Sequence, residues 1–208
     1  MDQDPLLPEC YYHLFNHAVG NECLFRNRDN YGFFLKRYAD YIQPIAKTYA
    51  YCLMPNHFHF LVQIRDEQTL RALYHQKKTS RLLTAEVDYS AFVMQQLSNL
   101  FNSYAKAYNK RFERRGALFI DKLRRKQVES DDYFTTLIAY IHRNPVHHGF
   151  CRRANDWGFS SINSTTSSRS THLERSAVLD WFGGIESYVS FHQNFTVNAS
   201  SDDWEFGY

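Results

Sequence analysis

Hydrophobic and polar residues alternate along the first 150 residues with two periods, one typical of strands and one of helices. Short β-branched and aromatic runs with two-residue alternation predict strands, whereas apolar residues three or four positions apart predict amphipathic helices. The first predicted elements are a strand at Tyr11 to Val19, a helix at Tyr31 to Ala46 capped by Asp29, and strands at Tyr49 to Met54 and His57 to Ile64. They are followed by a helix at Ser90 to Phe112 and a strand at Arg124 to Val128. The last predicted element is a helix that is capped by Ser130 and ends near Asn144 and Pro145.

Four strands and two crossover helices in this order indicate an α+β fold. The expected architecture is a ferredoxin-like split βαβ arrangement with a four-stranded antiparallel sheet and an added helix after the last strand. The helices would cover one face of the sheet and leave the other face open. Residues 65–88 form a polar excursion that holds a short helix at most. After Phe150 the chain becomes rich in Ser, Thr and Asn, so we expect one domain at residues 1–160 and an acidic, partly flexible C-terminal extension at residues 161–208.

The overall composition is that of a globular protein. Of the 208 residues, 44% are hydrophobic and 22% are charged. No apolar run approaches the roughly 18 residues of a membrane span, and the acidic start lacks the apolar stretch of a signal peptide. The four cysteines are widely spread and form no CxxC pair, which favours free thiols over a zinc finger. We therefore expect a cytoplasmic protein without a membrane partner.

The net charge of +2 conceals an uneven distribution. Residues 106–126 contain nine basic and two acidic residues, whereas residues 172–208 contain one basic and six acidic residues. Such asymmetry suggests one surface for nucleic acid and an acidic tail that lies elsewhere. A solvated charged face is the alternative. The residues expected to bind DNA phosphates are Arg111, Arg114, Arg115, Lys122, Arg124, Arg125 and Lys126.

The strand at His57 to Ile64 contains the most interesting pair of side chains. Alternation places Phe58 and Phe60 on the face beneath the helices and His57 and His59 on the opposite face, about 7 Å apart along the strand. Two imidazoles presented together can hold one divalent ion. Spacing alone favours two ordinary histidines, because ten histidines occur in the chain and a zinc site needs a further strong ligand.

The last predicted helix could supply the missing groups. Tyr140 and Asn144 are four residues apart and therefore lie on one flank of that helix. A tyrosine there could attack a phosphodiester and form a covalent phosphotyrosine, and the asparagine could bind a metal ion or orient the tyrosine. On chemistry alone, Tyr140 is more simply one of 15 tyrosines that fill the core.

Two longer motifs resemble a known family. The stretch from Tyr51 to Val62, which contains His57-Phe58-His59, is similar to the His-hydrophobic-His signature of IS200-type transposases with a single catalytic tyrosine. The stretch Tyr140-Ile141-His142-Arg143-Asn144-Pro145-Val146-His147-His148-Gly149 resembles the catalytic helix of their REP-associated tyrosine transposase branch. Gly116 to Phe119 and Asp156 to Ser161 also look like that branch, and the similarity covers about residues 11–162.

The resemblance implies a metal-dependent endonuclease that nicks and rejoins hairpin-bearing single-stranded DNA through a 5′-phosphotyrosine intermediate. It implies Tyr140 as the nucleophile and His57 and His59 as ligands of Mg²⁺ or Mn²⁺. Asn144 occupies the position of the third ligand, where the insertion-sequence members usually have Gln. The implied partner is DNA with a REP-like or palindromic hairpin, and the implied assembly is a monomer or a homodimer. A swapped catalytic helix would place Tyr140 on a partner's histidines.

Two other functions remain open from the residues. The chain could be a domesticated protein that binds DNA hairpins without cleaving them, although intact Tyr140, His57 and His59 argue against that. It could also be a zinc-dependent hydrolase, for which the sequence offers no convincing third ligand and no glutamate base.

Overall fold

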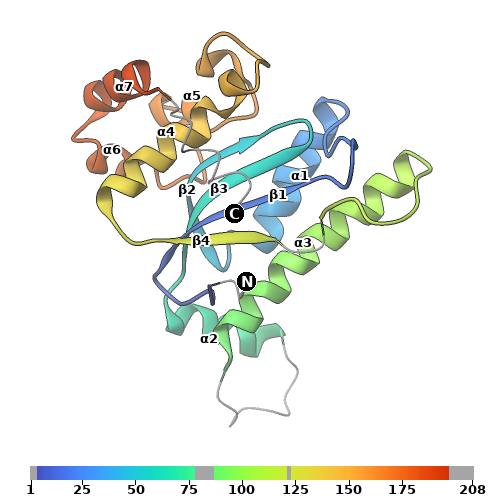
Figure 1. The fold of residues 1–208 in the computed structure, drawn as a ribbon. Coiled ribbons are helices and arrows are strands. Elements are labelled where there is room, and N and C mark those ends of the chain that lie inside the picture. Colours follow the sequence, from blue (N-terminus) through green and yellow to red (C-terminus); the bar gives the residue numbers. More distant parts are fainter. Residues whose placement is uncertain (1–3, 78–86, 121–122, 197–208) are drawn as a thin grey trace.

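A four-stranded antiparallel sheet forms the centre of the molecule (Figure 1). The computed structural model describes residues 4–77, 87–120 and 123–196. Its strands are β1 (Tyr11–His17), β2 (Ala46–Leu53), β3 (His57–Ile64) and β4 (Arg124–Val128), in the spatial order β2-β3-β1-β4. Its helices are α1 (Arg28–Tyr41), α2 (Glu67–Lys77), α3 (Tyr89–Arg111), α4 (Asp131–His147), α5 (Ile162–Thr166), α6 (Arg175–Trp181) and α7 (Ile185–Asn194), with a 3₁₀ turn, η1 (Ala154–Asp156). The predicted α+β, ferredoxin-like fold is confirmed.

Helices α1 and α3 cover one face of the sheet, as the alternation in β3 predicts. Phe58 and Phe60 point toward them, and the Phe34 ring lies 5.5 Å from that of Phe58. Helix α1 differs from the prediction at both ends. Its cap is the Asn27 side chain, not Asp29, because Asn27 accepts the backbone N–H of Asn30 in a capping box. It ends at Tyr41 because the residue before Pro44 is disfavoured in a helix.

The described part of the excursion at residues 65–88 contains helix α2, which packs against α3. The first turn of α2 is fixed from outside the helix, since Asp66 accepts the backbone N–H of Thr69 at 2.8 Å. Residues 78–86 lie outside the described residues. The short helix predicted for this segment is therefore present.

The second face of the sheet is covered over β2 and β3, contrary to the prediction of an open face. Helix α4 lies across β2, and Figure 1 shows α5, α6 and α7 gathered around α4 at the same end of the sheet. The apolar stripe of α4, including Phe134 and Leu137, is buried with Val178 of α6 and Tyr188 of α7. Enough apolar surface therefore exists on α4, α6 and α7 to build a second core on the face expected to be free.

The C-terminal extension is packed rather than loose over α5, α6 and α7. The Trp181 ring stacks on Phe134 at 4.3 Å, and Tyr188 is fully buried. Local composition misled the prediction, because a Ser- and Thr-rich stretch precedes helices in which a few apolar residues, among them Val178 and Tyr188, pack into the core under α4. The boundary between residues 160 and 161 stays a prediction, and residues 197–208 lie outside the described residues.

Helix α4 continues to His147, two residues past the end predicted near Asn144 and Pro145. Proline normally disfavours the helical conformation in the preceding residue, but the packing of α4 along the sheet outweighs that preference. The helix has His148 as its C-cap, and the next residue, Gly149, has a φ of +73° in the left-handed region. Glycine adopts that conformation without the steric cost of a Cβ atom.

A buried hydrogen-bonded group ties α4 to α7 and to the edge of β2. His142 Nδ1 lies 2.8 Å from His192 Nε2, and His142 Nε2 lies 2.7 Å from Ser161 Oγ. Ser161 Oγ in turn accepts the backbone N–H of Tyr51 at 2.8 Å. The segment from Asp156 to Ser161, which resembles the transposase branch in sequence, therefore connects the helix of Tyr140 to the sheet.

We expect this group to make the protein sensitive to acid. Burial lowers the pKa of His192 from 6.5 to about 4 and lowers the pKa of His142 well below 6.5. The unfolded chain therefore takes up protons first as the pH falls below about 6.5, so the free energy of unfolding should decrease from there to pH 4. For His192 the loss is on the order of 3 kcal/mol. Urea unfolding at several pH values would measure it.

His192→Phe provides the control for that prediction. The variant should be less stable at pH 7.5, because His142 loses a partner, yet its stability should decline less steeply between pH 6.5 and 4. Equal slopes for the two proteins would show that His192 does not titrate in this range.

Candidate active site

The pairing of β1 with β3 brings several histidine side chains together on the face under α4. His17 lies opposite His57, and Phe15 lies opposite His59. The His17 and His57 rings stack at 4.7 Å, and the His57 and His59 rings are 5.2 Å apart. His57 is 2% exposed and His59 is fully buried. The predicted placement of the two histidines side by side on the face opposite Phe58 is confirmed, although that face is buried.

Helix α4 brings the Asn144 amide between the two histidines. Asn144 Oδ1 lies 3.0 Å from His57 Nε2, and Asn144 Nδ2 lies 3.3 Å from His59 Nε2. The structure therefore unites strand and helix at the Nε2 atoms of both histidines. The sequence motif predicted this meeting of His57, His59 and Asn144.

The donor atoms of this trio suit one divalent cation. Two neighbouring ligand atoms of an octahedral ion with bonds of about 2.1 Å are about 3 Å apart, which is close to the separation of His57 Nε2 and Asn144 Oδ1. If both Nε2 atoms present lone pairs, Asn144 Oδ1 faces another acceptor, and a cation between them removes that repulsion. Among the described residues, no three His, Cys, Asp or Glu side chains are grouped to hold a metal ion. The Asn144 amide oxygen is the further donor atom that the structure places beside the two histidines.

Burial lowers the pKa of the histidines at the centre of this cluster. Burial, with the nearby His13 and His57 imidazoles as further causes, lowers the pKa of His59 well below 6.5. Burial and the charge of Lys126 lower the pKa of His13 to about 3. Both imidazoles are therefore neutral at physiological pH, which is the state that can donate a lone pair to a metal ion.

Tyr140 lies one helical turn before Asn144, on the same flank of α4. Its ring stands edge-on to the His59 ring at 5.7 Å and edge-on to the His13 ring at 6.4 Å. Tyr140 is 1% exposed. The tyrosine and the two histidines of one chain thus meet without a contribution from a second chain.

The basic residues predicted to bind DNA divide between different environments. Arg124 lies opposite Phe15 and Lys126 opposite His13, so both belong to the sheet face of the histidines. Arg125 has the opposite orientation and donates to Met94 on α3 and to the Asp4 carbonyl. The edge strand β4 therefore places two of its three cations beside the candidate site.

The remaining predicted DNA-binding residues lie near the end of α3 or outside the described residues. Arg114 supports the turn after α3, since it pairs with Glu22 at 2.9 Å and donates to the Ala117 carbonyl. Arg111 pairs with Asp29 on α1, and Arg115 is exposed. Lys122 lies outside the described residues. The internal contacts of Arg114 indicate a structural role, which differs from the prediction.

Three further histidines belong to the cluster and were missed by sequence reasoning. His13 Nε2 lies 3.0 Å from His59 Nδ1, His17 stacks on His57, and the exposed His148 ring lies 4.9 Å from the ring of His57. Signals for them exist in the sequence. His13 and His17 share one face of a predicted strand, and His148 is four residues after Asn144 on the same flank of the helix. The register of β1 against β3 shows that His13 and His17 meet the two predicted histidines, and the position of α4 brings His148 to His57.

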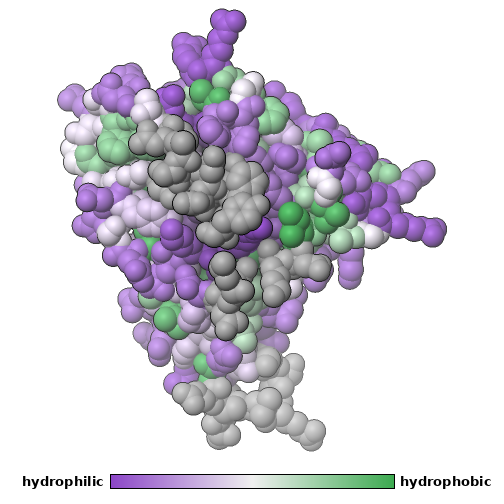
Figure 2. Space-filling model, viewed as in Figure 1, coloured by the Kyte–Doolittle hydropathy of each residue, from purple (hydrophilic) through white to green (hydrophobic). Residues whose placement is uncertain are grey.

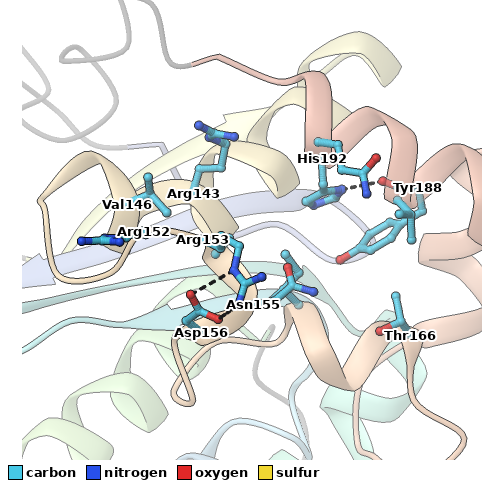
Figure 3. A pocket seen from close by; sticks show the side chains of 13 residues that line it. Arg143, Val146, Arg152, Arg153, Asn155, Asp156, Thr166, Tyr188 and His192 are labelled. Atoms are coloured by element: carbon cyan, nitrogen blue, oxygen red, sulfur yellow. Dashed lines mark hydrogen bonds and ion pairs between the residues drawn. The ribbon is translucent and has the colours of Figure 1, made fainter.

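A cavity of about 500 Å³ lies on the other side of α4. Figure 3 shows Arg143 and Val146 of α4 facing it, together with Tyr188 and His192 of α7 and the Arg153–Asp156 ion pair. None of its lining residues is Tyr140, Asn144 or a histidine of the sheet. Helix α4 therefore presents one flank to the candidate site and the other to this cavity.

The surface of the described part of the chain is mostly hydrophilic on the side seen in Figure 2, with small, separate apolar patches. None of the helices in the described ranges has the length and hydrophobicity needed to cross a membrane.

Comparisons with known proteins agree with the motifs. No protein-family model matches the chain. Over 120 residues, 56% of this chain, the sequence is 25% identical to a protein of Haemophilus influenzae named "Putative REP-associated tyrosine transposase", and the match spans 59% of that relative. The fold matches a solved structure of a REP-associated tyrosine transposase bound to a REP hairpin, with a TM-score of 0.57 and 11% identity over 81% of this chain and 86% of that one. The resemblance to REP-associated tyrosine transposases is therefore confirmed in sequence and in fold.

Proposed function

We propose that this chain is a metal-dependent endonuclease and transesterase that nicks and rejoins hairpin-bearing single-stranded DNA. The observation that carries the proposal is the convergence of Tyr140, Asn144, His57 and His59 within one chain. The similarity to a REP-associated tyrosine transposase solved with a REP hairpin supports a hairpin substrate. In this proposal each chain uses its own Tyr140, so a monomer suffices.

Tyr140 is the nucleophile in this mechanism. Its phenolic oxygen attacks the scissile phosphorus and loses its proton, a bond forms between tyrosine and the 5′-phosphate, and the 3′-oxygen leaves and takes up a proton. Attack by a 3′-hydroxyl then reverses the step and rejoins DNA. The free energy of the phosphodiester bond is kept in the phosphotyrosine, so joining needs no nucleotide cofactor.

His57, His59 and Asn144 would hold Mg²⁺ or Mn²⁺. The bound ion supplies charge neutralisation at the scissile phosphate. The phenol needs such help because its usual pKa is about 10. The chain's own contribution is to hold Asn144 Oδ1 3.0 Å from His57 Nε2 and the Asn144 amide beside His59 Nε2, on a helix whose His142 side chain hydrogen-bonds to Ser161.

A covalent-adduct assay tests the proposal. The substrate is an oligonucleotide with a hairpin taken from DNA flanking the gene, labelled 3′ to the cleavage site. Incubation with Mg²⁺ or Mn²⁺ should give a labelled protein band that resists SDS, and EDTA should prevent it. Hairpin binding without cleavage of any strand, unchanged by EDTA, would instead support a non-catalytic hairpin-binding protein.

Neighbouring arginines on β4 test where DNA lies. Arg124 shares the sheet face of the histidines, whereas Arg125 faces α3. We expect Arg124→Gln to weaken binding of single-stranded DNA uniformly across sequences and to reduce the salt slope of log K by about 1. Arg125→Gln is the matched control and should leave the slope unchanged. Fluorescence anisotropy at several salt concentrations measures both, and a larger effect of Arg125→Gln would place the DNA on the other face.

A further inference from the structure

His59 has a second nitrogen, and that nitrogen has a partner. Its Nε2 atom faces Asn144, while its Nδ1 atom lies 3.0 Å from Nε2 of His13 on the neighbouring strand. His13 is 1% exposed, and the two rings are nearly parallel, 20° apart. Phe15 stacks on His13 at 4.7 Å and on His59 at 5.8 Å. The orientation of the His59 ring is thus fixed by strand register and by packing on both sides.

Only one proton can lie between His59 Nδ1 and His13 Nε2. If His59 donates, its Nε2 atom keeps a lone pair and can bind a metal ion. If His13 donates, the proton of His59 must be on Nε2, where it blocks ligation. Metal ligands of this type usually donate their other N–H to an acceptor, which sets the tautomer and raises the basicity of the ligating nitrogen.

We infer that His13 is a positioning residue whose Nε2 atom accepts a hydrogen bond from the Nδ1–H group of His59 and so directs the Nε2 lone pair of His59 at the metal ion. The inference rests on the proposed function, since it gives His59 a metal to bind. It adds a residue on β1 to a site otherwise formed by β3 and α4.

The other nitrogen of His13 supports a specific role. His13 Nδ1 is buried and has no hydrogen-bond partner among the described residues. In the tautomer that suits ligation this atom carries a proton, and an unsatisfied buried donor is costly. A histidine chosen for core stability alone would not be expected to keep that cost. The tautomer of His59 that can bind a metal ion therefore requires His13 to carry a buried Nδ1–H group without a hydrogen-bond partner in the described part of the chain.

Binding of Mn²⁺ alone, followed by calorimetry or EPR, tests the inference without any activity measurement. His13→Phe preserves a buried ring but cannot accept a hydrogen bond, and we expect it to weaken Mn²⁺ binding by about 10- to 100-fold. His13→Gln restores an acceptor and should bind within a few-fold of the unmodified protein. Tyr38→Phe, which removes a buried 2.8 Å hydrogen bond to Thr48 under α1, is the matched control and should bind normally.

Nitrogen NMR of the unmodified, Mg²⁺-loaded protein gives a readout that does not depend on the folding of a variant. The inference requires His13 protonated at Nδ1 and His59 protonated at Nδ1. A His13 protonated at Nε2 would overturn it, as would unchanged Mn²⁺ affinity in folded His13→Phe. Those results would leave the proposed function intact, whereas absence of Mn²⁺ binding by the unmodified protein would remove both.

Discussion

Replacing Tyr140 with phenylalanine is expected to abolish the covalent DNA adduct and to reduce hairpin cleavage by at least about 10⁴-fold, as removal of a nucleophile does in other covalent enzymes. The substitution keeps the ring that stands edge-on to His59, so the packing of α4 should persist. Binding of hairpin DNA and of Mn²⁺ should stay within a few-fold of the unmodified protein. The measurement is a single-turnover cleavage assay with SDS gel analysis.

Tyr133→Phe is the matched control, because Tyr133 is also a tyrosine of α4 and is half-buried. It should form the adduct at the normal rate. An SDS-resistant adduct in Tyr140→Phe would show that another residue is the nucleophile, and loss of DNA binding in the same variant would show that Tyr140 contributes to structure or recognition instead.

Replacing His57 or His59 with alanine is expected to reduce cleavage by at least about 10³-fold, since removal of one charge-stabilising group typically costs 10²- to 10³-fold and here the metal ion would be lost with it. Mn²⁺ binding should weaken to the same extent in both variants. His75→Ala on α2 is the control histidine, because its ring contact is with Tyr74 and not with the sheet.

Asn144 variants separate ligation from hydrogen bonding. Asn144→Ala should lose most metal affinity, whereas Asn144→Asp keeps an oxygen at the same position and should retain Mg²⁺ binding and cleavage, because carboxylates are preferred ligands of Mg²⁺. Failure of Asn144→Asp with normal Mg²⁺ binding would indicate that the amide N–H groups, and not the oxygen, are essential.

The sequence was informative where one element carries its own pattern. The bounds of β3 and β4 agree with the prediction, and alternation in β3 placed His57 and Phe58 on opposite faces correctly. These features depend on the period of a single strand. The i, i+4 relation of Tyr140 and Asn144 is likewise local, so it survived the unexpected passage of α4 through Pro145.

The sequence was less informative where two distant segments must meet. His13 belongs to the site only because β1 pairs with β3 in one register, and a shift of one residue would turn His13 to the other face. The burial of the site was missed for the same reason. Tyr188 and His192 are far from α4 in sequence, and no local pattern reveals that α7 packs there.

The contact between Tyr140 and His59 within one chain affects how activity would depend on protein concentration. An active site shared between two chains disappears on dilution below the dissociation constant of the dimer, so its output rises with the square of protein concentration. A site completed by a single chain has an output proportional to concentration, and each molecule is fully equipped even when it is the only copy present. Under the proposed function, the 5.7 Å contact between these two rings would let each molecule act without a partner chain.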